Sequence, residues 1–368
     1  MIAVGLVGPL PPPPGGMSNQ TQQLSQLLQQ AGLRVRVVRT NAPYRPAWIG
    51  AIPGVRAIFR LVPYLVELWR ISARVGILHI MANSGWAWHL LAAPAVWIGK
   101  MRGVAVIVNY RGGDAAGFLK RSHRWVTPTM RLADRVIVPS GYLQQVFAGY
   151  GIASQIVPNI IDLHCFARKS SDDAPGADPV ILVARHLEPL YDVATAIRAF
   201  AIVRRKYPGA TLVVAGDGPE RARLVALTEE LGVQDRVEFT GRLTNSKMAG
   251  LYARADAVVN TSLLDNMPIS ILEALAVGVP VVSTDVGGIP YLVTDGETAL
   301  LAPPRDTAKI AAALLRILGD HDLRSRLIES GWQLVQQFTW ERVRPRLLRC
   351  YSEFIPVAGQ CKSPASLP

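Results

Sequence analysis

Residues 265–283 read Asp265-Asn-Met-Pro268-Ile-Ser-Ile-Leu-Glu273-Ala-Leu-Ala-Val-Gly278-Val-Pro-Val-Val-Ser, and this stretch decides how the chain is interpreted. Proline is favoured at the first position of a helix and glycine just past its end, so Pro268 and Gly278 predict a short helix followed by a buried strand. Inside this apolar helix the carboxylate of Glu273 needs a partner. Asp265 lies just ahead of the helix N-terminus, where backbone N–H groups attract anions. The stretch therefore predicts a ligand site.

Length and composition set the broad class of the protein. The 368 residues are half hydrophobic, which allows two domains that each bury a core. Lys and Arg number 39 against 27 Asp and Glu, a net charge of +12, which favours nucleic acid, an anionic membrane surface or phosphorylated substrates as partners. No nucleic-acid recognition motif accompanies the charge, so we do not expect nucleic acid as a partner.

The sequence also bears on location and metal content. No apolar run reaches the roughly 18 residues that a membrane-spanning helix needs, and the N-terminus lacks the pattern of a signal peptide. The three cysteines fit neither a disulfide framework nor a zinc site: Cys165, Cys350 and Cys361. We expect a cytoplasmic protein without a metal site, whose basic charge suits a peripheral position at the inner face of the cytoplasmic membrane.

The first half begins as a nucleotide-binding domain. A strand over 2–7, a glycine loop, a helix over 17–31 and a strand over 33–38 follow in order. The loop lacks the G-x-G-x-x-G fingerprint. Gly15 and Gly16 would allow the backbone to approach a phosphate closely, and the plainer alternative is a flexible turn.

Two polar residues lie at or just after the ends of strands in this half. Arg111 comes after a strand over 104–108, and in open α/β sheets the loops at the carboxyl ends of the strands hold the ligand. Arg111 is therefore placed to meet an anion, unless it is a solvated turn residue. His79, near the end of a strand over 77–80, is interpreted as a buried histidine with its hydrogen bonds satisfied.

A basic and aromatic helix is predicted over 55–74, with Pro63 expected to kink it. Basic residues lie beside aromatic and aliphatic ones along it: Arg56, Arg60, Arg70 and Arg74. This pattern is typical of a helix on an anionic membrane surface, and equally of an amphipathic helix packed on the sheet. A second basic cluster at 120–124 would extend the same face if the two segments were neighbours.

A change in composition divides the chain. Residues 166–178 are polar and rich in turn formers, which indicates a linker. Helices and strands then alternate again, so we predict an α/β protein with two doubly wound Rossmann-like domains, 1–165 and 179–338, facing across a cleft. A final helix over 339–355 can return to the first domain, and 356–368 forms a loose tail.

The second domain offers its own ligand contacts. Arg185 follows the first strand of this domain, and its forked guanidinium suits a phosphate. Arg242 follows Gly241 in a later loop of the same kind, for which a simple turn is the alternative interpretation.

Taken together, these residues resemble the retaining nucleotide-sugar glycosyltransferases of family 4, which have the GT-B fold. The resemblance extends from the glycine pair to about residue 354 and rests on motifs in a fixed order: Gly15-Gly16, Val138-Pro-Ser140, Val157-Pro-Asn-Ile-Ile-Asp162, Ala184-Arg-His-Leu187, Gly216-Asp-Gly-Pro219, Phe239-Thr-Gly-Arg242, Asp265 with Glu273, Gly287-Gly288-Ile-Pro290 and Asp295-Gly296.

The family motif is a pair of glutamates eight residues apart. Glu273 matches the second, which binds the donor ribose. Asp265 replaces the first, which lies near the transferred sugar, so the acid is kept with one methylene less. Asn266, Met267 and Pro268 match the loop whose backbone N–H groups contact the donor sugar and diphosphate.

The resemblance also implies roles for the arginines. Arg185 matches the residue that holds the diphosphate, and the glycine pair and Arg242 are placed on the donor side. Two positions depart from the pattern: Tyr191 stands where a lysine is usual, and Arg111 stands where many members have a histidine. Neutralisation of the diphosphate then depends more on Arg185, the helix N-terminus and Arg111. We expect Asp265 and Arg111 to be the catalytic residues.

The resemblance implies transfer of a sugar from a nucleoside-diphosphate sugar to an acceptor hydroxyl with retention, without metal or other cofactor. The basic helix favours a lipid-linked saccharide or glycolipid acceptor, as in polysaccharide or cell-envelope assembly. Two alternatives remain: a sugar-nucleotide epimerase of the same fold, and a catalytically silent nucleotide-sugar-binding protein, which Tyr191 and Asp265 suggest.

Overall fold

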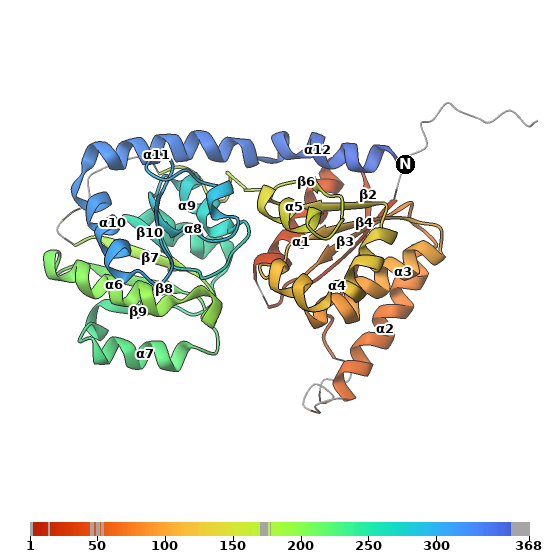
Figure 1. Ribbon diagram of the computed structural model, residues 1–368, viewed down its shortest axis with the longest axis horizontal. Coiled ribbons are helices and arrows are strands. Elements are labelled where there is room, and N and C mark those ends of the chain that lie inside the picture. Colours follow the sequence, from red (N-terminus) through yellow and green to blue (C-terminus); the bar gives the residue numbers. More distant parts are fainter. Residues whose placement is uncertain are drawn as a thin grey trace, which may run out of the picture.

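The computed structural model describes residues 3–13, 15–44, 48, 52, 55–169, 176 and 178–354, without the side chains of residues 55 and 56. The expected tail over 356–368 lies outside the described residues. Figure 1 shows two α/β domains side by side, each built on one parallel sheet.

The first domain contains a six-stranded parallel sheet in the order β2-β1-β3-β4-β5-β6. Its strands are β1 (Ala3–Gly8), β2 (Arg34–Arg39), β3 (Ile77–Ala82), β4 (Ala105–Tyr110), β5 (Arg135–Val138) and β6 (Gln155–Ile156). Its helices are α1 (Gly16–Gln30), α2 (Val55–Ser72), the π-helix η2 (Trp88–Ala92), α3 (Ala93–Met101), α4 (Ala115–Leu132) and α5 (Gly141–Ala148).

The second domain repeats this architecture with the order β12-β11-β10-β7-β8-β9. Its strands are β7 (Val180–Ala184), β8 (Thr211–Ala215), β9 (Val237–Phe239), β10 (Ala257–Asn260), β11 (Val281–Thr284) and β12 (Leu300–Ala302). Its helices are α6 (Val193–Lys206), α7 (Arg221–Glu230), α8 (Asn245–Arg254), α9 (Ile269–Val277), α10 (Thr307–Gly319) and α11 (His321–Val335). The prediction of two doubly wound α/β domains is confirmed.

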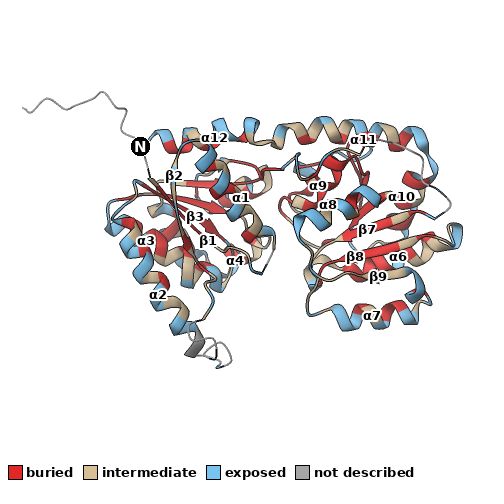
Figure 2. Ribbon diagram, turned by 180° about the vertical axis from the view of Figure 1, so that it is seen from behind, coloured by how far each residue is buried: buried red, intermediate tan, exposed pale blue. Residues whose placement is uncertain are grey.

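Helices cover both faces of each sheet, so the strands are buried, as Figure 2 shows in red. In the first domain, α2, α3 and α4 pack on one face, where Tyr64 and Leu68 of α2 join a buried cluster with Ile80 of β3. On the other face, Leu28 of α1 packs with Leu6 of β1. Removing such apolar surface from water is the main stabilising contribution to the fold.

The last helix, α12 (Trp340–Ser352), returns to the first domain, and Figure 1 shows α11 and α12 running along one edge of both domains. Leu347 and Tyr351 of α12 are buried beside β1. The chain thus passes between the domains twice, once after β6 and once before α12. The two connecting segments are hydrogen-bonded to each other, because the Ile161 N–H donates to the Phe338 carbonyl at 3.0 Å.

Two details differ from the sequence-based expectation. Pro268 is the residue before α9 rather than its first residue, with φ −64° and ψ 117°. Ile161 and Phe166 pack in the core of the second domain, so the passage between domains begins before residue 165. Pro63 lies inside α2 at an exposed position, and the expected kink there stays a prediction.

Candidate active site between the two domains

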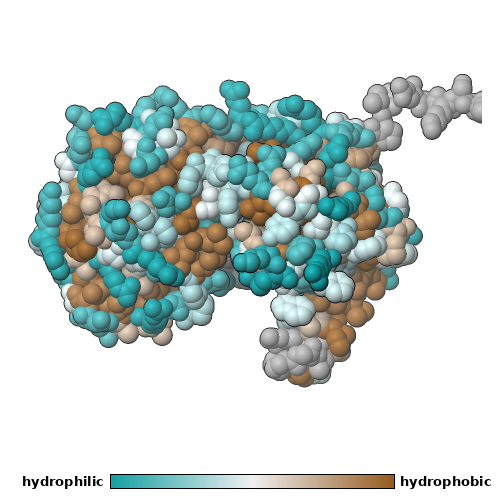
Figure 3. Space-filling model, viewed as in Figure 1, coloured by the Kyte–Doolittle hydropathy of each residue, from teal (hydrophilic) through white to brown (hydrophobic). Residues whose placement is uncertain are grey.

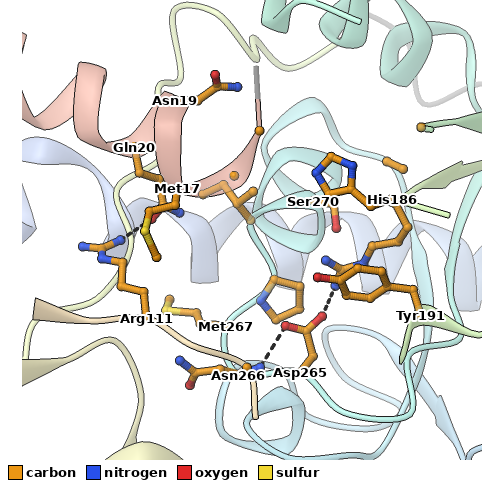
Figure 4. A pocket seen from close by; sticks show the side chains of 18 of the residues that line it. Met17, Asn19, Gln20, Arg111, His186, Tyr191, Asp265, Asn266, Met267 and Ser270 are labelled. Carbon is orange, nitrogen blue, oxygen red and sulfur yellow. Dashed lines mark hydrogen bonds and ion pairs between the residues drawn. The ribbon is translucent and has the colours of Figure 1, made fainter. Parts of the chain in front are cut away.

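A cavity of about 560 Å³ lies between the domains, where the carboxyl ends of both sheets face each other. Parallel strands end at one edge of a sheet, so the loops that follow them converge on this cavity. All ten residues singled out from the sequence line it: Gly15, Gly16, Arg111, Arg185, Arg242, Asp265, Asn266, Met267, Pro268 and Glu273. Figure 4 shows side chains from both domains pointing into it.

Arg185 is held by three neighbours after β7. Its Nε donates to Asn260 Oδ1 at 2.9 Å, and its guanidinium forms an ion pair with Asp265; both side chains of the pair are 12% exposed. The Tyr191 ring centre lies 5.0 Å from the guanidinium carbon. Where the resemblance leads us to expect a lysine, this chain therefore supplies an aromatic surface that fixes Arg185 but adds no charge.

The backbone around Asp265 is fixed by a glycine. Asp265 Oδ1 accepts from the Asn266 N–H at 2.8 Å, and the Asp265 carbonyl accepts from the Gly288 N–H at 2.9 Å. A Cβ added to Gly288 would lie 1.8 Å from the Asn266 carbonyl oxygen, well inside contact distance. Only glycine allows this close approach, so the 287–290 loop supports the stretch that carries Asp265.

The N-terminus of α9 opens into the same cavity. Its first residues line the wall, and no side chain caps it. The first N–H groups of a helix have no partner within the helix, and the helix dipole is positive at this end. This end of α9 can therefore bind an anion beside Arg185.

Glu273, on the same helix, finds the partner that its apolar setting requires. The Tyr252 hydroxyl donates to Glu273 Oε2 at 2.9 Å. Burial raises the pKa of Glu273 to about 7, although this hydrogen bond and the charge of Arg185 act in the opposite direction. The carboxyl group is thus divided between its two protonation states near neutral pH.

Arg111 lies on the wall formed by the first domain. Its Nε donates to Asn109 Oδ1 at 3.1 Å, and its Nη1 donates to the amide oxygens of Gln20 and Asn159. Asn159 also donates from Nδ2 to the Met267 carbonyl at 2.8 Å, which ties this wall to the 265–268 loop. Burial lowers the pKa of Arg111 to about 10, so the side chain carries its charge at neutral pH.

The glycine pair and Arg242 lie near the mouth of the cavity. A Cβ added to Gly16 would meet no atom within 4 Å, so the space beside the start of α1 is open. Arg242 is exposed. Together with burial, which is the larger cause, its charge lowers the pKa of His186, another wall residue.

Sequence analysis missed several contacts that shape this site. Ser140 donates to Asn266 Oδ1, and Asn19 donates to Asn245 Oδ1 at 2.9 Å; both bonds join the two domains. The sequence marks Ser140 only as part of the Val138-Pro-Ser140 motif. The partners of such bonds are 126 and 226 residues apart, so no local pattern reveals them.

The described residues contain neither a metal-binding cluster nor a helix that could span a membrane. In that part of the chain, no three His, Cys, Asp or Glu side chains converge as a metal site would require. None of the helices described there is both long and apolar enough to cross a bilayer.

Comparisons with known proteins follow the same division into halves. Residues 14–164 match the family described as Glycosyltransferase Family 4, and residues 167–333 match the family described as Glycosyl transferases group 1. The D-inositol 3-phosphate glycosyltransferase of Nocardia farcinica is 34% identical over 389 positions, which cover 92% of this chain and 84% of that protein.

Solved structures share the fold of the whole chain. Sucrose-phosphate synthase from Thermosynechococcus elongatus has a TM-score of 0.74 and 22% identity, covering 96% of this chain and 99% of its own. HepE from Anabaena, solved with UDP and glucose, has a TM-score of 0.73 and 18% identity, covering 96% and 100%. The resemblance seen in the sequence is confirmed: this chain belongs to the family 4-like glycosyltransferases with the GT-B fold.

Proposed function

We propose that the protein transfers a sugar, with retention, from a nucleoside-diphosphate sugar to a hydroxyl of a lipid-linked saccharide or glycolipid. The observation that carries the proposal is the arrangement of Arg185, the uncapped start of α9 and Glu273 around one cavity between the domains. A volume of about 560 Å³ is of the size that holds a small-molecule ligand.

The donor diphosphate is assigned to Arg185 and the N-terminus of α9. A guanidinium and free backbone N–H groups stabilise a leaving phosphate by charge and hydrogen bonds without a metal ion. Glu273, one turn further along α9, then accepts hydrogen bonds from the ribose hydroxyls. The solved complex of HepE with UDP and glucose supports a uridine nucleotide as the first donor to test.

Asp265 is assigned to the reacting sugar. Its carboxylate is paired with Arg185 and is held by the Asn266 N–H, so it is oriented before a substrate arrives. In this position it can orient the donor sugar and stabilise the positive charge of an oxocarbenium-like transition state.

The acceptor proposal rests on the outer surface of α2, α3 and α4. Among the described residues, every large exposed apolar side chain except Tyr291 lies in the first domain. We define the apolar face as the members on or just before these helices: Ile58, Phe59, Val62, Val66, Trp69, Trp86, Leu90, Trp97, Met101 and Trp125. Figure 3 shows hydrophobic residues, in brown, along α2 at the lower right.

The apolar face is accompanied by positive charge. The same helices and the turns after α2 and α3 carry exposed basic residues: Arg70, Arg74, Arg102, Lys120, Arg121 and Arg124. α2 packs against α3, and α3 packs against α4, so the two basic segments seen in the sequence are brought together in one layer. Exposed tryptophan beside Arg and Lys suits the boundary between acyl chains and anionic head groups.

The test follows release of nucleoside diphosphate from a panel of nucleotide sugars, with and without a lipid extract as acceptor. Transfer predicts release that depends on the lipid and a product that keeps the anomeric configuration of the donor. An epimerase would convert the donor without any acceptor, and a silent binding protein would bind the donor without releasing diphosphate. Either result would overturn the proposal.

A further inference from the structure

The guanidinium of Arg111 faces the cavity without a carboxylate partner among the described residues. Its partners are the neutral amide oxygens of Gln20, Asn109 and Asn159. Among the described residues, Arg111 Nη2 has no hydrogen-bond partner, because the three bonds are made by Nε and Nη1. Arg185, by contrast, has an acidic partner. A partly buried cation without a counter-charge is costly, and a bound anion would offset that cost.

A buried network holds this guanidinium in place. Because the Asn109 oxygen accepts from Arg111, the Asn109 amide nitrogen donates to His79 Nε2 at 3.0 Å. His79 Nδ1 is then protonated and donates to the Tyr351 hydroxyl, 2.7 Å away. Burial is the main cause that lowers the pKa of His79 to about 3, so this neutral form persists. The returning helix α12 thereby helps to position Arg111.

The start of α1 adds to the positive potential at this corner. Gly16 begins the helix, and Gln20, one turn later, binds Arg111 directly. Both belong to the cavity wall, and the space beside Gly16 is open. The positive end of the helix dipole and the guanidinium therefore act on the same volume.

This corner is separate from the part of the cavity around Arg185. Figure 4 shows Arg111 and Gln20 on the side of the cavity opposite His186 and Tyr191, and the Tyr191 ring lies against Arg185. Since Asn159 bonds both Arg111 and the Met267 carbonyl, the corner adjoins the loop assigned to the donor sugar.

We propose that Arg111 and the start of α1 form a second anion subsite, which takes a negatively charged group of one substrate beside the point of transfer. This inference rests on the proposed function. The group is a phosphoryl group of the acceptor or a carboxylate of the donor sugar, because a guanidinium pairs with both in the same two-pronged geometry.

Four variants isolate the subsite. Arg111→Gln removes the charge, whereas Arg111→Lys keeps the charge without the planar fork. Gln20→Glu leaves Arg111 in place and supplies the missing counter-charge from within the protein. Gln22→Glu makes the same change on the same helix at an exposed position and is the matched control.

Two titrations read out the result. Inorganic phosphate is titrated into each protein, free and saturated with the nucleoside diphosphate that it binds best, while the melting temperature is followed. UDP-glucose and UDP-glucuronate are titrated by calorimetry. We expect the ligand whose anionic group enters the subsite, either phosphate or UDP-glucuronate, to bind about tenfold more weakly to Arg111→Gln and Gln20→Glu than to the wild type. The affinity of Arg111→Lys should lie between those of these two variants and the wild type. Gln20→Glu should also raise the melting temperature of the unliganded protein, and Gln22→Glu should change neither property.

The pattern of losses identifies the source of the anion. A loss for phosphate, with equal binding of the two nucleotide sugars, assigns the subsite to an acceptor phosphoryl group. A loss confined to UDP-glucuronate assigns it to a donor carboxylate. Unchanged binding of all three ligands overturns the proposal, as does an equal loss for the nucleoside diphosphate itself. If no nucleotide binds the wild type, the proposed function fails, while phosphate titration of the free protein still decides the subsite.

Discussion

Arg185 and Asp265 form an ion pair on the wall of the cleft, although the resemblance assigned them to different parts of the donor. Arg185, assigned to the diphosphate, and Asp265, assigned to the reacting sugar, therefore partly neutralise each other. Tyr191 packs on the guanidinium where a lysine was expected, so Asp265 meets the charge of Arg185 alone at this point.

We expect Asp265→Asn to lower turnover with little change in donor binding. The amide keeps the shape but cannot stabilise positive charge on the sugar, so kcat should fall about 100-fold while the donor KM changes less than about fivefold. Initial rates of nucleoside diphosphate release measure both quantities. Asp285→Asn, at an exposed position outside the cavity, is the control. An unchanged kcat would remove Asp265 from the chemistry.

The carboxyl group of Glu273 makes stability depend on pH. Its pKa rises from 4.5 to about 7 on folding, so between these values the folded state holds a proton that the unfolded state has lost. Stability therefore falls as pH rises through this window and levels off above pH 7. We expect Glu273→Gln to be more stable than the wild type at pH 8, by at most roughly 3 kcal/mol, and to lose that advantage at pH 5. Urea unfolding without ligand at both pH values checks this.

The same substitution should weaken donor binding, because only the ionised carboxylate accepts two hydrogen bonds from a ribose. Calorimetric titration should show about tenfold weaker binding of the donor by Glu273→Gln, and wild-type affinity that increases from pH 6 to pH 8. Glu297→Gln, at an exposed position, controls for net charge. Equal affinity in wild type and Glu273→Gln at pH 8 would contradict the ribose assignment.

Gly288→Ala should damage the site through the backbone. Its Cβ would overlap the Asn266 carbonyl, so the 265–268 loop must move. We expect a loss of about 2 kcal/mol in the free energy of unfolding and a loss of donor binding. Gly250→Ala is the matched control: it lies in α8 with nothing within 4 Å of the new Cβ, and it should be neutral or slightly stabilising. Equal effects of the two variants would disprove the role of the close approach.

Binding to membranes should depend on the apolar face. Trp125 is 79% exposed and Arg124 is its exposed neighbour on α4. We expect Trp125→Ala and Arg124→Gln each to weaken binding to vesicles containing phosphatidylglycerol by about fivefold, and binding to decrease with added salt. Sedimentation with vesicles measures this, with Arg316→Gln on α10 as the charge control. Salt-independent binding, or none, would exclude an anionic membrane surface as the partner.

Local sequence patterns predicted the two parallel α/β domains and the loops that line the cleft. Buried parallel strands give apolar runs, and the residues that follow them necessarily meet at one sheet edge, so Arg111, Arg185 and Asp265 could be placed in one site. The start of α9 was displaced by one residue, because Pro268 suits both the first helical position and the residue before it.

What the sequence could not provide is the partner of each polar group. Arg111 depends on Gln20 and Asn159, which are 91 and 48 residues away in the chain. Glu273 depends on Tyr252 of another helix. These pairings arise only when helices and loops that are distant in the chain pack together, and they determine which charges in the cleft are already balanced.

The measurement that tests the central claim most directly is calorimetric titration of nucleoside diphosphates, beginning with UDP, into the wild type and Arg185→Ala. The account predicts one site per chain in the wild type, with affinity reduced at least about tenfold in Arg185→Ala because the diphosphate loses a charge-assisted hydrogen bond. Equal affinity in the two proteins, or no binding of any nucleoside diphosphate by the wild type, would contradict it.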